Sequence, residues 1–360
     1  MTETVLVTGA TGYLASHVVK VFQEAGYKVR GTVRSLKDPD KLNWLKNLCP
    51  DAKHPLELVE ANLLDPGSWK DAVKGCTYVM HVASPFPMGH VENEDDVIKP
   101  AVEGTKNVLQ KCAEAGTVRK VVLTSSVVAV HGEDEIEPGK AYTEEDWTNC
   151  ESKTVGAYSK SKTLAEKAAW DFVKNLEGSE KFELSVINPM LILGPVLNVT
   201  SGTSVEVMKR FMENQMTALP QVGLVICDVR DVALAHLRAM TIPEAANHRH
   251  LIYSANMWLK EVADILAKEF RPQGYTIPTM HCPYFVLWLA SFFNKTAKSY
   301  LSRVGRQLKI DNTRMRTVLK IEPRDVSSTL NDMVYSLIDH GIIKKTDKYR
   351  GKKVEIKAEE

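Results

Sequence analysis

The sequence predicts an α/β protein with a doubly wound parallel sheet and a smaller C-terminal lobe. Two observations predict this fold class. In the first half, short runs rich in Val, Ile and Leu alternate with longer stretches of helical periodicity, a pattern typical of strands buried on both faces. Repeated strand–helix–strand units imply right-handed crossovers, which place helices on both faces of one sheet.

Six apolar runs of four to six residues are the expected strands: Thr4–Thr8, Lys28–Val33, Leu56–Glu60, Tyr78–His81, Lys120–Thr124 and Glu183–Asn188. Four longer stretches between them are the expected helices: Tyr13–Ala25, Gly67–Lys74, Val97–Ala115 and Val155–Leu176. Together they predict a dinucleotide-binding domain over residues 1–188.

The rhythm breaks after residue 188. Pro, Gly and polar residues crowd positions 188–203 (NPMLILGPVLNVTSGT), which predicts a loop. A strand at 224–227 and a helix at 229–240 are expected to rejoin the sheet, so that segment 224–240 belongs to the first domain. Residues 189–223 and 241–345 then form the substrate lobe, and residues 346–360 form a solvated, charged tail.

Composition excludes several classes of protein. The 360 residues carry a net charge of +1, which gives no general attraction to nucleic acid. Six Cys are scattered without a CxxC pair, and His54, His248 and His250 show no metal-ligand pairing. These features predict a protein of a reducing compartment, with a cytoplasmic location and no metal site.

No targeting or membrane-spanning segment is expected. The N-terminus lacks a basic leader. The most apolar stretch, Tyr284–Phe293 (YFVLWLASFF), is far below the roughly 20 residues that span a bilayer. We expect it to be a buried amphipathic helix, with a membrane-surface or partner-binding helix as the alternative.

A glycine-rich loop follows the first strand and begins the first helix (TGATGYLA, residues 8–15). Gly9 permits a tight turn, Gly12 lets the backbone approach a pyrophosphate, and Ala15 allows close packing of helix on strand. The amides and dipole of a helix N-terminus favour an anion there. In this strand–helix context the loop predicts a Rossmann-type nucleotide site.

The end of the second strand indicates which dinucleotide binds. A site for NAD usually has an acidic residue here to bind the ribose 2′-OH. No Asp or Glu occurs between Val29 and Lys37, and Arg34 stands at the strand end with Lys37 and Lys41 nearby. A guanidinium pairs well with a 2′-phosphate. The sequence therefore predicts NADP(H).

A proton-transfer group is predicted at the start of the last helix of this domain. Tyr158 and Lys162 are four positions apart and share one helix face. An ammonium near a phenol favours the phenolate and lowers the tyrosine pKa. Such a tyrosine exchanges a proton with a carbonyl or alcohol oxygen during hydride transfer. A serine at the end of the fifth strand would stabilise the charge on that oxygen. We choose Ser126, with Ser125 left open.

These motifs occur together in order: TGATGYLA, VRGTVR, MHVASP, LTSS, YSKSK, INPMLILGP and DVRDVA. The set resembles the extended short-chain dehydrogenase/reductase family, and within it the dihydroflavonol 4-reductase, cinnamoyl-CoA reductase and ketone (methylglyoxal) reductase branch. The resemblance is strong over residues 3–255.

The resemblance implies a site, position by position. Ser126, Tyr158 and Lys162 would be catalytic. Tyr158 and Lys162 would also touch the cofactor, together with Gly9, Thr11, Gly12, Tyr13, Leu14, Arg34, Lys41, Asn62, Leu63, Val82, Ala83, Ser84 and Pro189. Asn62-Leu63 stands where the family usually has Asp-Leu beside the adenine, and Asn107 would have a supporting role.

Other residues have simpler interpretations. His81 and His131 are expected to be packed or solvated rather than catalytic. Met208, Met212 and Met216 recur every four residues. They form either a core stripe or the wall of an apolar substrate site.

The leading hypothesis is NADPH-dependent reduction of a ketone or aldehyde to an alcohol. The alternatives are a hydroxysteroid dehydrogenase or sugar-nucleotide epimerase of the same family, and a non-catalytic cofactor-sensing scaffold. The expected partner is a small carbonyl substrate, and the chain is expected to be a monomer or homodimer.

Overall fold

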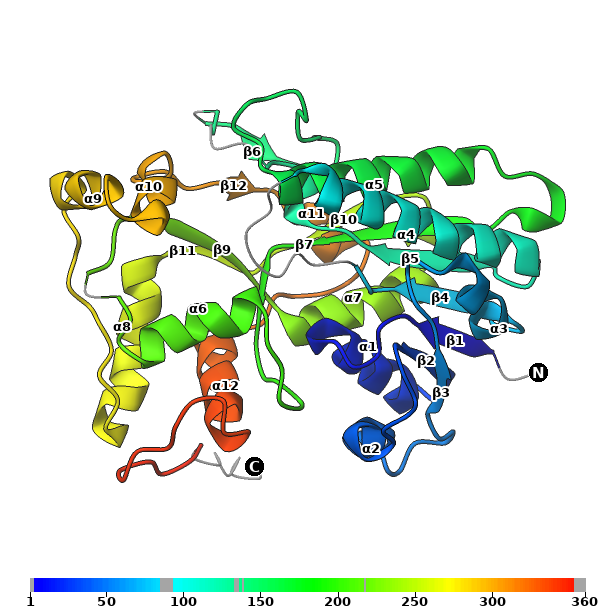
Figure 1. Ribbon diagram of the computed structural model, residues 1–360, viewed down its shortest axis with the longest axis horizontal. Helices are drawn as coiled ribbons and strands as arrows, with labels where there is room; N and C mark the ends of the chain where they lie inside the picture. The colour runs from blue at the N-terminus through cyan, green and yellow to red at the C-terminus, as the bar shows by residue number, and fades with distance from the viewer. Residues whose placement is uncertain (1–2, 85–92, 133–135, 138, 217, 353–360) are drawn as a thin grey trace. The chain divides into compact units, whose positions relative to one another are not determined.

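The computed structural model describes residues 3–84, 93–132, 136–137, 139–216 and 218–352. The chain divides into two compact units (Figure 1). The first unit comprises residues 1–190, 229–253 and 308–323, and the second comprises residues 191–228, 254–307 and 324–360. The first unit therefore takes two segments, 241–253 and 308–323, that the sequence assigned to the substrate lobe.

A seven-stranded parallel sheet forms the centre of the first unit. Its order is β10-β7-β5-β4-β1-β2-β3. The strands are β1 (Thr4–Val7), β2 (Lys28–Val33), β3 (Glu57–Glu60), β4 (Tyr78–His81), β5 (Lys120–Thr124), β7 (Glu183–Pro189) and β10 (Arg249–Ile252). All six expected strands are present. β1 is buried along its whole length, as its apolar run predicts.

Helices cover both faces of this sheet, as a doubly wound fold requires (Figure 1). α4 packs against α5, and α1 packs against α7. The helices of the unit are α1 (Tyr13–Glu24), α2 (Asn43–Lys46), α3 (Trp69–Val73), α4 (Asp95–Ala115), α5 (Ala157–Lys174), α7 (Val229–Thr241) and α11 (Thr313–Thr317). A short parallel pair, β6 (Ala141–Tyr142) with β12 (Lys309–Ile310), lies outside the main sheet.

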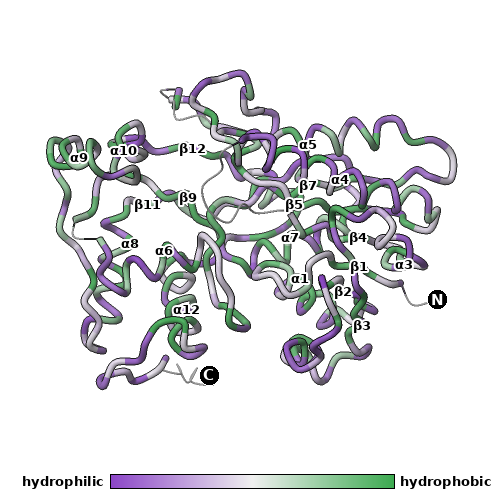
Figure 2. The backbone as a smooth tube through the Cα atoms, viewed as in Figure 1, coloured by the Kyte–Doolittle hydropathy of each residue, from purple (hydrophilic) through white to green (hydrophobic). Residues whose placement is uncertain are grey.

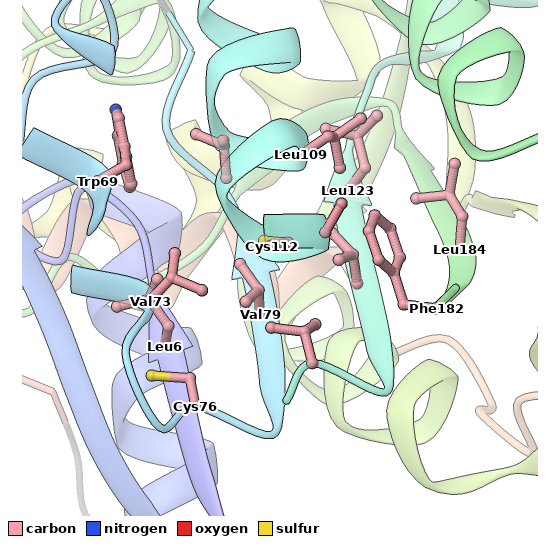
Figure 3. Packing of buried hydrophobic residues seen from close by; sticks show 14 of the residues in the cluster. Leu6, Trp69, Val73, Cys76, Val79, Leu109, Cys112, Leu123, Phe182 and Leu184 are labelled. Carbon is pink, nitrogen blue, oxygen red and sulfur yellow. The ribbon is translucent and has the colours of Figure 1, made fainter. Parts of the chain in front are cut away.

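One hydrophobic core of this unit lies between the sheet and α3, α4 and α5. Trp69 and Val73 of α3 pack with Leu109 and Cys112 of α4 over the apolar side chains of β4 and β5, among them Val79 (Figure 3). α4 ends where Gly116 adopts a left-handed conformation, with φ 61°. Glycine suits this position because it has no Cβ to strain the turn.

The second unit has its own sheet. β8 (Leu191–Leu193) pairs parallel with β9 (Gly223–Asp228), and β9 pairs antiparallel with β11 (Ala255–Trp258). Its helices are α6 (Thr203–Met212), α8 (Leu259–Phe270), α9 (Tyr284–Ser291), α10 (Lys295–Leu301) and α12 (Val326–Asp339). The loop expected over 188–203 is only partly correct: β7 extends to Pro189 and residues 191–193 form β8, whereas segment 194–202 lacks regular structure.

The prediction that the strand at 224–227 rejoins the main sheet is wrong. That strand is β9 and lies in the three-stranded sheet, although the helix after it, α7, belongs to the first unit. β10 pairs with β7 instead, through Arg249 opposite Val186. The edge of β7 that faces away from β5 is therefore already occupied.

Three smaller expectations also change. The tail is not solvated throughout, because the Thr346 hydroxyl donates a hydrogen bond to the backbone carbonyl of Gln273, and the Arg350 amide donates to the side-chain oxygen of Gln273. Met208 and Met212 are core residues, but α6 ends at Met212, so Met216 is not on the helix. Only Leu287 of α9 is buried, so the expected burial of this helix is wrong.

Among the described residues, no helix combines the length and the apolar character needed to cross a membrane.

Candidate active site

The sheet topology brings the predicted site residues to one edge. The strands are parallel, so their carboxyl ends lie on the same side. The glycine loop follows β1, Arg34 follows β2, Asn62 follows β3, Val82 follows β4 and Ser126 follows β5. β1 lies between β2 and β4, where the direction of winding reverses. Open α/β sheets bind ligands at this topological switch point.

The glycine loop is a tight turn with close neighbours. Gly9 has φ +67°, and a Cβ at this position would lie 3.0 Å from the Cβ of Ala83. Gly12 is the extended N-cap of α1, and a Cβ there would lie 3.2 Å from the carbonyl oxygen of Gly9. The first turn of α1 has no acidic side chain. Its first amides have no acceptor inside the helix, which suits a bound phosphate.

Several residues that sequence reasoning did not assign hold this loop. Thr32 of β2 accepts hydrogen bonds from the amides of Gly9 and Ala10. A Cβ on Gly31 would lie 2.7 Å from that of Ala10, so Gly31 lets the loop cross β2 closely. A glycine inside a strand is the signal for such an approach.

The segment after β4 is tied to the same loop. The hydroxyl of Thr8 accepts a hydrogen bond from the amide of Ala83 at 2.8 Å and lies 3.1 Å from Nδ1 of His81. Val82, Ala83 and Ser84 therefore run beside the glycine loop. Pro85, the last residue of the MHVASP motif, lies outside the described residues.

The basic residues after β2 differ in their pairing. Arg34 is exposed, directly after the last residue of β2. The ammonium of Lys41 is 2.8 Å from Asp38, which raises the lysine pKa and lowers that of the aspartate through this hydrogen bond. Arg34 is thus the better candidate for a phosphate ligand.

Asn62 and Leu63 form a fixed turn after β3. The side-chain oxygen of Asn62 accepts from the amide of Leu64 at 3.1 Å, and its carbonyl accepts from the indole of Trp69 at 2.8 Å. The carbonyl of Leu63 accepts from the side chain of Asn107, on α4, at 2.9 Å. Through this hydrogen bond Asn107 holds the turn in place, which is the structural role expected for it.

The two serines after β5 have different surroundings. Ser125 is buried, and its hydroxyl has no hydrogen-bond partner in the described part of the chain. Ser126 caps a short 3-10 turn, where its hydroxyl accepts from the amide of Val128 at 3.4 Å. The same hydroxyl is hydrogen-bonded to Tyr158. The structure therefore brings Ser126, and not Ser125, to the tyrosine.

The ionisation of Tyr158 differs from the sequence expectation. Burial raises the pKa of Tyr158, and the hydrogen bond from Ser126 lowers it in part. Lys162, whose ammonium is 6.0 Å from the ring centroid, does not bring the pKa below its usual value. The expected direction is wrong because loss of solvation outweighs the hydrogen bond from Ser126. Tyr158 is protonated at neutral pH.

Lys162 lies one turn further along α5, partly buried. Burial lowers the pKa of Lys162 to about 8, against the opposing influence of the Glu166 carboxylate. Burial also lowers the pKa of His81 to about 3, with a smaller contribution from Lys162. His81 is therefore a neutral, packed side chain at physiological pH. His131 lies against the Tyr142 ring, with centroids 4.2 Å apart.

A buried ion pair behind these residues was missed by sequence reasoning. Nε of Arg249, on β10, is 2.6 Å from Glu166 of α5, and Glu166 is fully buried. The amide of Asn188, on β7, donates to Glu166 at 2.8 Å and to the Ser126 carbonyl at 3.2 Å. Pro189 is the last residue of β7 and is buried. Glu166 therefore joins α5, the helix that carries Tyr158 and Lys162, to β10 through Arg249 and to β7 through Asn188.

The described residues contain no cluster of three or more His, Cys, Asp or Glu side chains able to hold a metal ion.

Comparison with known proteins shows the family to which the chain belongs. The model of the NAD dependent epimerase/dehydratase family matches residues 5–254. Cinnamoyl-CoA reductase 1 of Petunia hybrida is 39% identical over 280 residues, covering 77% of this chain and 80% of that protein. Cinnamoyl-CoA reductase 1 of Arabidopsis thaliana is 37% identical over 279 residues, covering 77% of each.

Solved structures are similar over nearly the whole chain. Gre2 of Candida albicans in complex with NADPH has a TM-score of 0.78 at 30% identity, covering 94% of this chain and 99% of that one. The yeast methylglyoxal/isovaleraldehyde reductase Gre2, also complexed with NADPH, has a TM-score of 0.76 at 28% identity with the same coverage. This chain belongs to the NAD dependent epimerase/dehydratase family, the extended short-chain dehydrogenases/reductases.

Proposed function

We propose that this oxidoreductase uses NADPH to reduce a ketone or aldehyde to an alcohol, with Tyr158 as the proton donor. One observation carries the proposal: the hydroxyls of Tyr158 and Ser126 are hydrogen-bonded, one helical turn from Lys162, at the carboxyl edge that also holds the glycine loop. A cofactor-sensing scaffold has no need of this arrangement.

The residues at the edge fit the cofactor. A Cβ on Gly9, Gly12 or Gly31 would meet neighbours at 3.2 Å or less, so the loop keeps its backbone accessible for a pyrophosphate. Two similar reductases hold NADPH in their solved structures. The bound NADPH would supply the hydride. The proposed contacts are Gly9, Thr11, Gly12, Tyr13 and Leu14 for the pyrophosphate, Arg34 and Lys41 for the 2′-phosphate, Asn62 and Leu63 for the adenine, and Val82, Ala83, Ser84 and Pro189 along the nicotinamide side.

Three side chains of the protein then take part in the transfer of one proton to the carbonyl oxygen. The raised pKa of Tyr158 keeps its phenol protonated at neutral pH, so it can give the proton to the carbonyl oxygen as negative charge develops there. The Ser126 hydroxyl donates a hydrogen bond to the same oxygen. The Lys162 ammonium lies next to the phenol that would become phenolate and stabilises it.

The candidate substrate classes come from the similar proteins. The similar proteins include reductases of an acyl-CoA thioester and of methylglyoxal, so thioester reduction to an aldehyde is the second candidate. NADPH oxidation across aldehydes, α-dicarbonyls, flavonoid ketones, acyl-CoA thioesters and steroids separates the two. We expect turnover with an aldehyde or ketone and none with a thioester.

Tyr158→Phe tests the catalytic assignment. It keeps the ring and removes the proton, and we expect kcat to fall about 10²- to 10⁴-fold while the thermal stabilisation by NADPH persists. Ser126→Ala and Ser125→Ala form a matched pair, because only Ser126 reaches the tyrosine. Ser126→Ala should lower kcat about 10²- to 10³-fold, and Ser125→Ala should be close to wild type. Near-normal turnover in Tyr158→Phe would show that another group donates the proton.

A further inference from the structure

α9 (Tyr284–Ser291) is hydrophobic around its whole circumference. Its sequence is YFVLWLAS, without a charged residue, and Figure 2 shows it as one of the hydrophobic segments of the chain. A helix that is apolar on all faces is normally buried in a protein core or in lipid. In this protein only part of it is covered.

One face of α9 packs inside the second unit. Leu287, 5% exposed, lies with Cys282 and Ala297 in a small core, and Ala290 and Tyr300 pack against it. The other faces and the residues that follow are open. We define the α9 surface by its seven large exposed side chains, Tyr284, Phe285, Val286, Trp288, Leu289, Phe292 and Phe293. A contiguous apolar surface of this kind marks an interaction site.

The charge around the α9 surface indicates its partner. The thirty-seven residues from Arg271 to Gln307, all in the second unit, contain no Asp or Glu. They contain five basic residues: Arg271, Lys295, Lys298, Arg303 and Arg306. Lys298, Arg303 and Arg306 are exposed on α10 or just after it, and α10 packs against α9. The surface is therefore apolar with a basic border, although the whole chain has a net charge of +1.

This combination favours an anionic surface over a second copy of the chain. A symmetric pair of α9 surfaces would bring the two basic borders together, and such like-charge contacts oppose association. An anionic lipid headgroup region attracts the same basic residues. Tyr and Trp side chains, as at 284 and 288, are also the ones enriched at the level of lipid headgroups.

We propose that the α9 surface docks onto the surface of an anionic lipid bilayer. α9 has eight residues and is about 12 Å long, so it lies in the interface and does not span it. The aromatic side chains enter the boundary between headgroups and acyl chains, and the exposed basic residues beside them bind lipid phosphates or carboxylates. This activity is separate from the reductase site.

Vesicle sedimentation of the full-length protein tests the proposal. Phosphatidylcholine vesicles and the same vesicles with added phosphatidylserine are compared at low and high salt. We expect binding only with phosphatidylserine, weakened by salt. The apolar variant Phe285→Ser/Phe292→Ser/Phe293→Ser should lose binding, whereas Val199→Ser, an exposed apolar residue of the same unit, should keep it.

A pair of charge variants separates the effect of the basic residues beside α9 on vesicle binding from the effect of the net charge of the whole protein. Lys298→Glu/Arg303→Glu/Arg306→Glu should weaken binding on the order of 100-fold, because each basic residue near the surface contributes about fivefold. Lys53→Glu/Lys74→Glu/Lys181→Glu changes the net charge equally at exposed positions of the first unit and should bind as wild type does. Unchanged thermal midpoints confirm that the variants fold.

Three results would overturn the proposal. One is no binding to phosphatidylserine vesicles, and another is equal loss of binding in the two charge variants. The third is a homodimer that the apolar variant dissociates while neither form binds vesicles, which would assign the α9 surface to a second copy of the chain.

Discussion

At the side chain of Tyr158, two effects on one phenol oppose each other. Removal from water disfavours the phenolate, and the hydrogen bond from Ser126 favours it. Because the first effect is larger, the resting residue keeps its proton. A reductase needs that proton when the carbonyl oxygen becomes negative, so the ionisation of Tyr158 suits the reducing direction of the proposed reaction.

Arg34 carries the prediction on cofactor choice. Arg34→Ser should raise KM for NADPH about 10- to 100-fold, because a charged hydrogen bond contributes about 1.5–3 kcal/mol, and should leave KM for NADH nearly unchanged. Lys41→Ser is the control with a smaller expected effect, since Lys41 is paired with Asp38 at 2.8 Å. Unchanged preference for NADPH in Arg34→Ser would mean that other groups bind the 2′-phosphate.

At the level of elements, one buried ion pair joins β10, β7 and α5. Glu166 accepts from Arg249, Asn188 and the Trp170 indole. The guanidinium of Arg249 also lies 3.8 Å from the centroid of the Trp147 ring. Glu166 therefore fixes α5 against β10 and against β7, the strand that carries Pro189.

Breaking this pair should cost far more than breaking a surface pair. Glu166→Gln leaves the buried guanidinium without its counter-ion and should lower the free energy of unfolding by about 3–5 kcal/mol. Glu206→Gln breaks the exposed pair with Arg210 and should cost less than about 1 kcal/mol. Urea denaturation measures both. Similar small losses would show that the Arg249 pair has no special structural role.

The sequence predicts elements well where the signal is local. The six predicted strands of the main sheet contain short apolar runs, and Tyr158 and Lys162 are joined by helical spacing alone. Arg249 and Glu166 are 83 residues apart, so nothing in the local pattern of either predicts their contact. β10 was missed for a related reason. It starts with Arg249 and His250, and the buried guanidinium of Arg249 has its counter-ion, Glu166, at a distant position in the sequence.

The exposure of α9 could not be read from composition either. An apolar run predicts burial, and only the structure shows that the covered face ends at Leu287 and a few neighbours. The direction of the Tyr158 pKa likewise depends on how much water the fold removes. The wrong predictions for α9 and for the Tyr158 pKa have the same cause. Both depend on how deeply the fold buries a side chain, and the neighbouring residues in the sequence do not determine that.

At the scale of the whole molecule, one edge of one sheet gathers the residues of the proposed reaction. Segments from residue 9 to residue 189 meet there because every strand of the main sheet runs in the same direction. The family match over residues 5–254 covers all of these segments. The central claim is that this edge reduces a carbonyl group with hydride from NADPH.

Isotope transfer tests that claim most directly. The wild-type protein is incubated with NADPH that carries deuterium on the transferred position and with each carbonyl of the substrate panel, and the product is examined by mass spectrometry and NMR. We expect an alcohol with one deuterium on the carbinol carbon, formed about 10²- to 10⁴-fold more slowly by Tyr158→Phe. Oxidation of NADPH without deuterium on that carbon, or labelling at an equal rate by Tyr158→Phe, would contradict the claim.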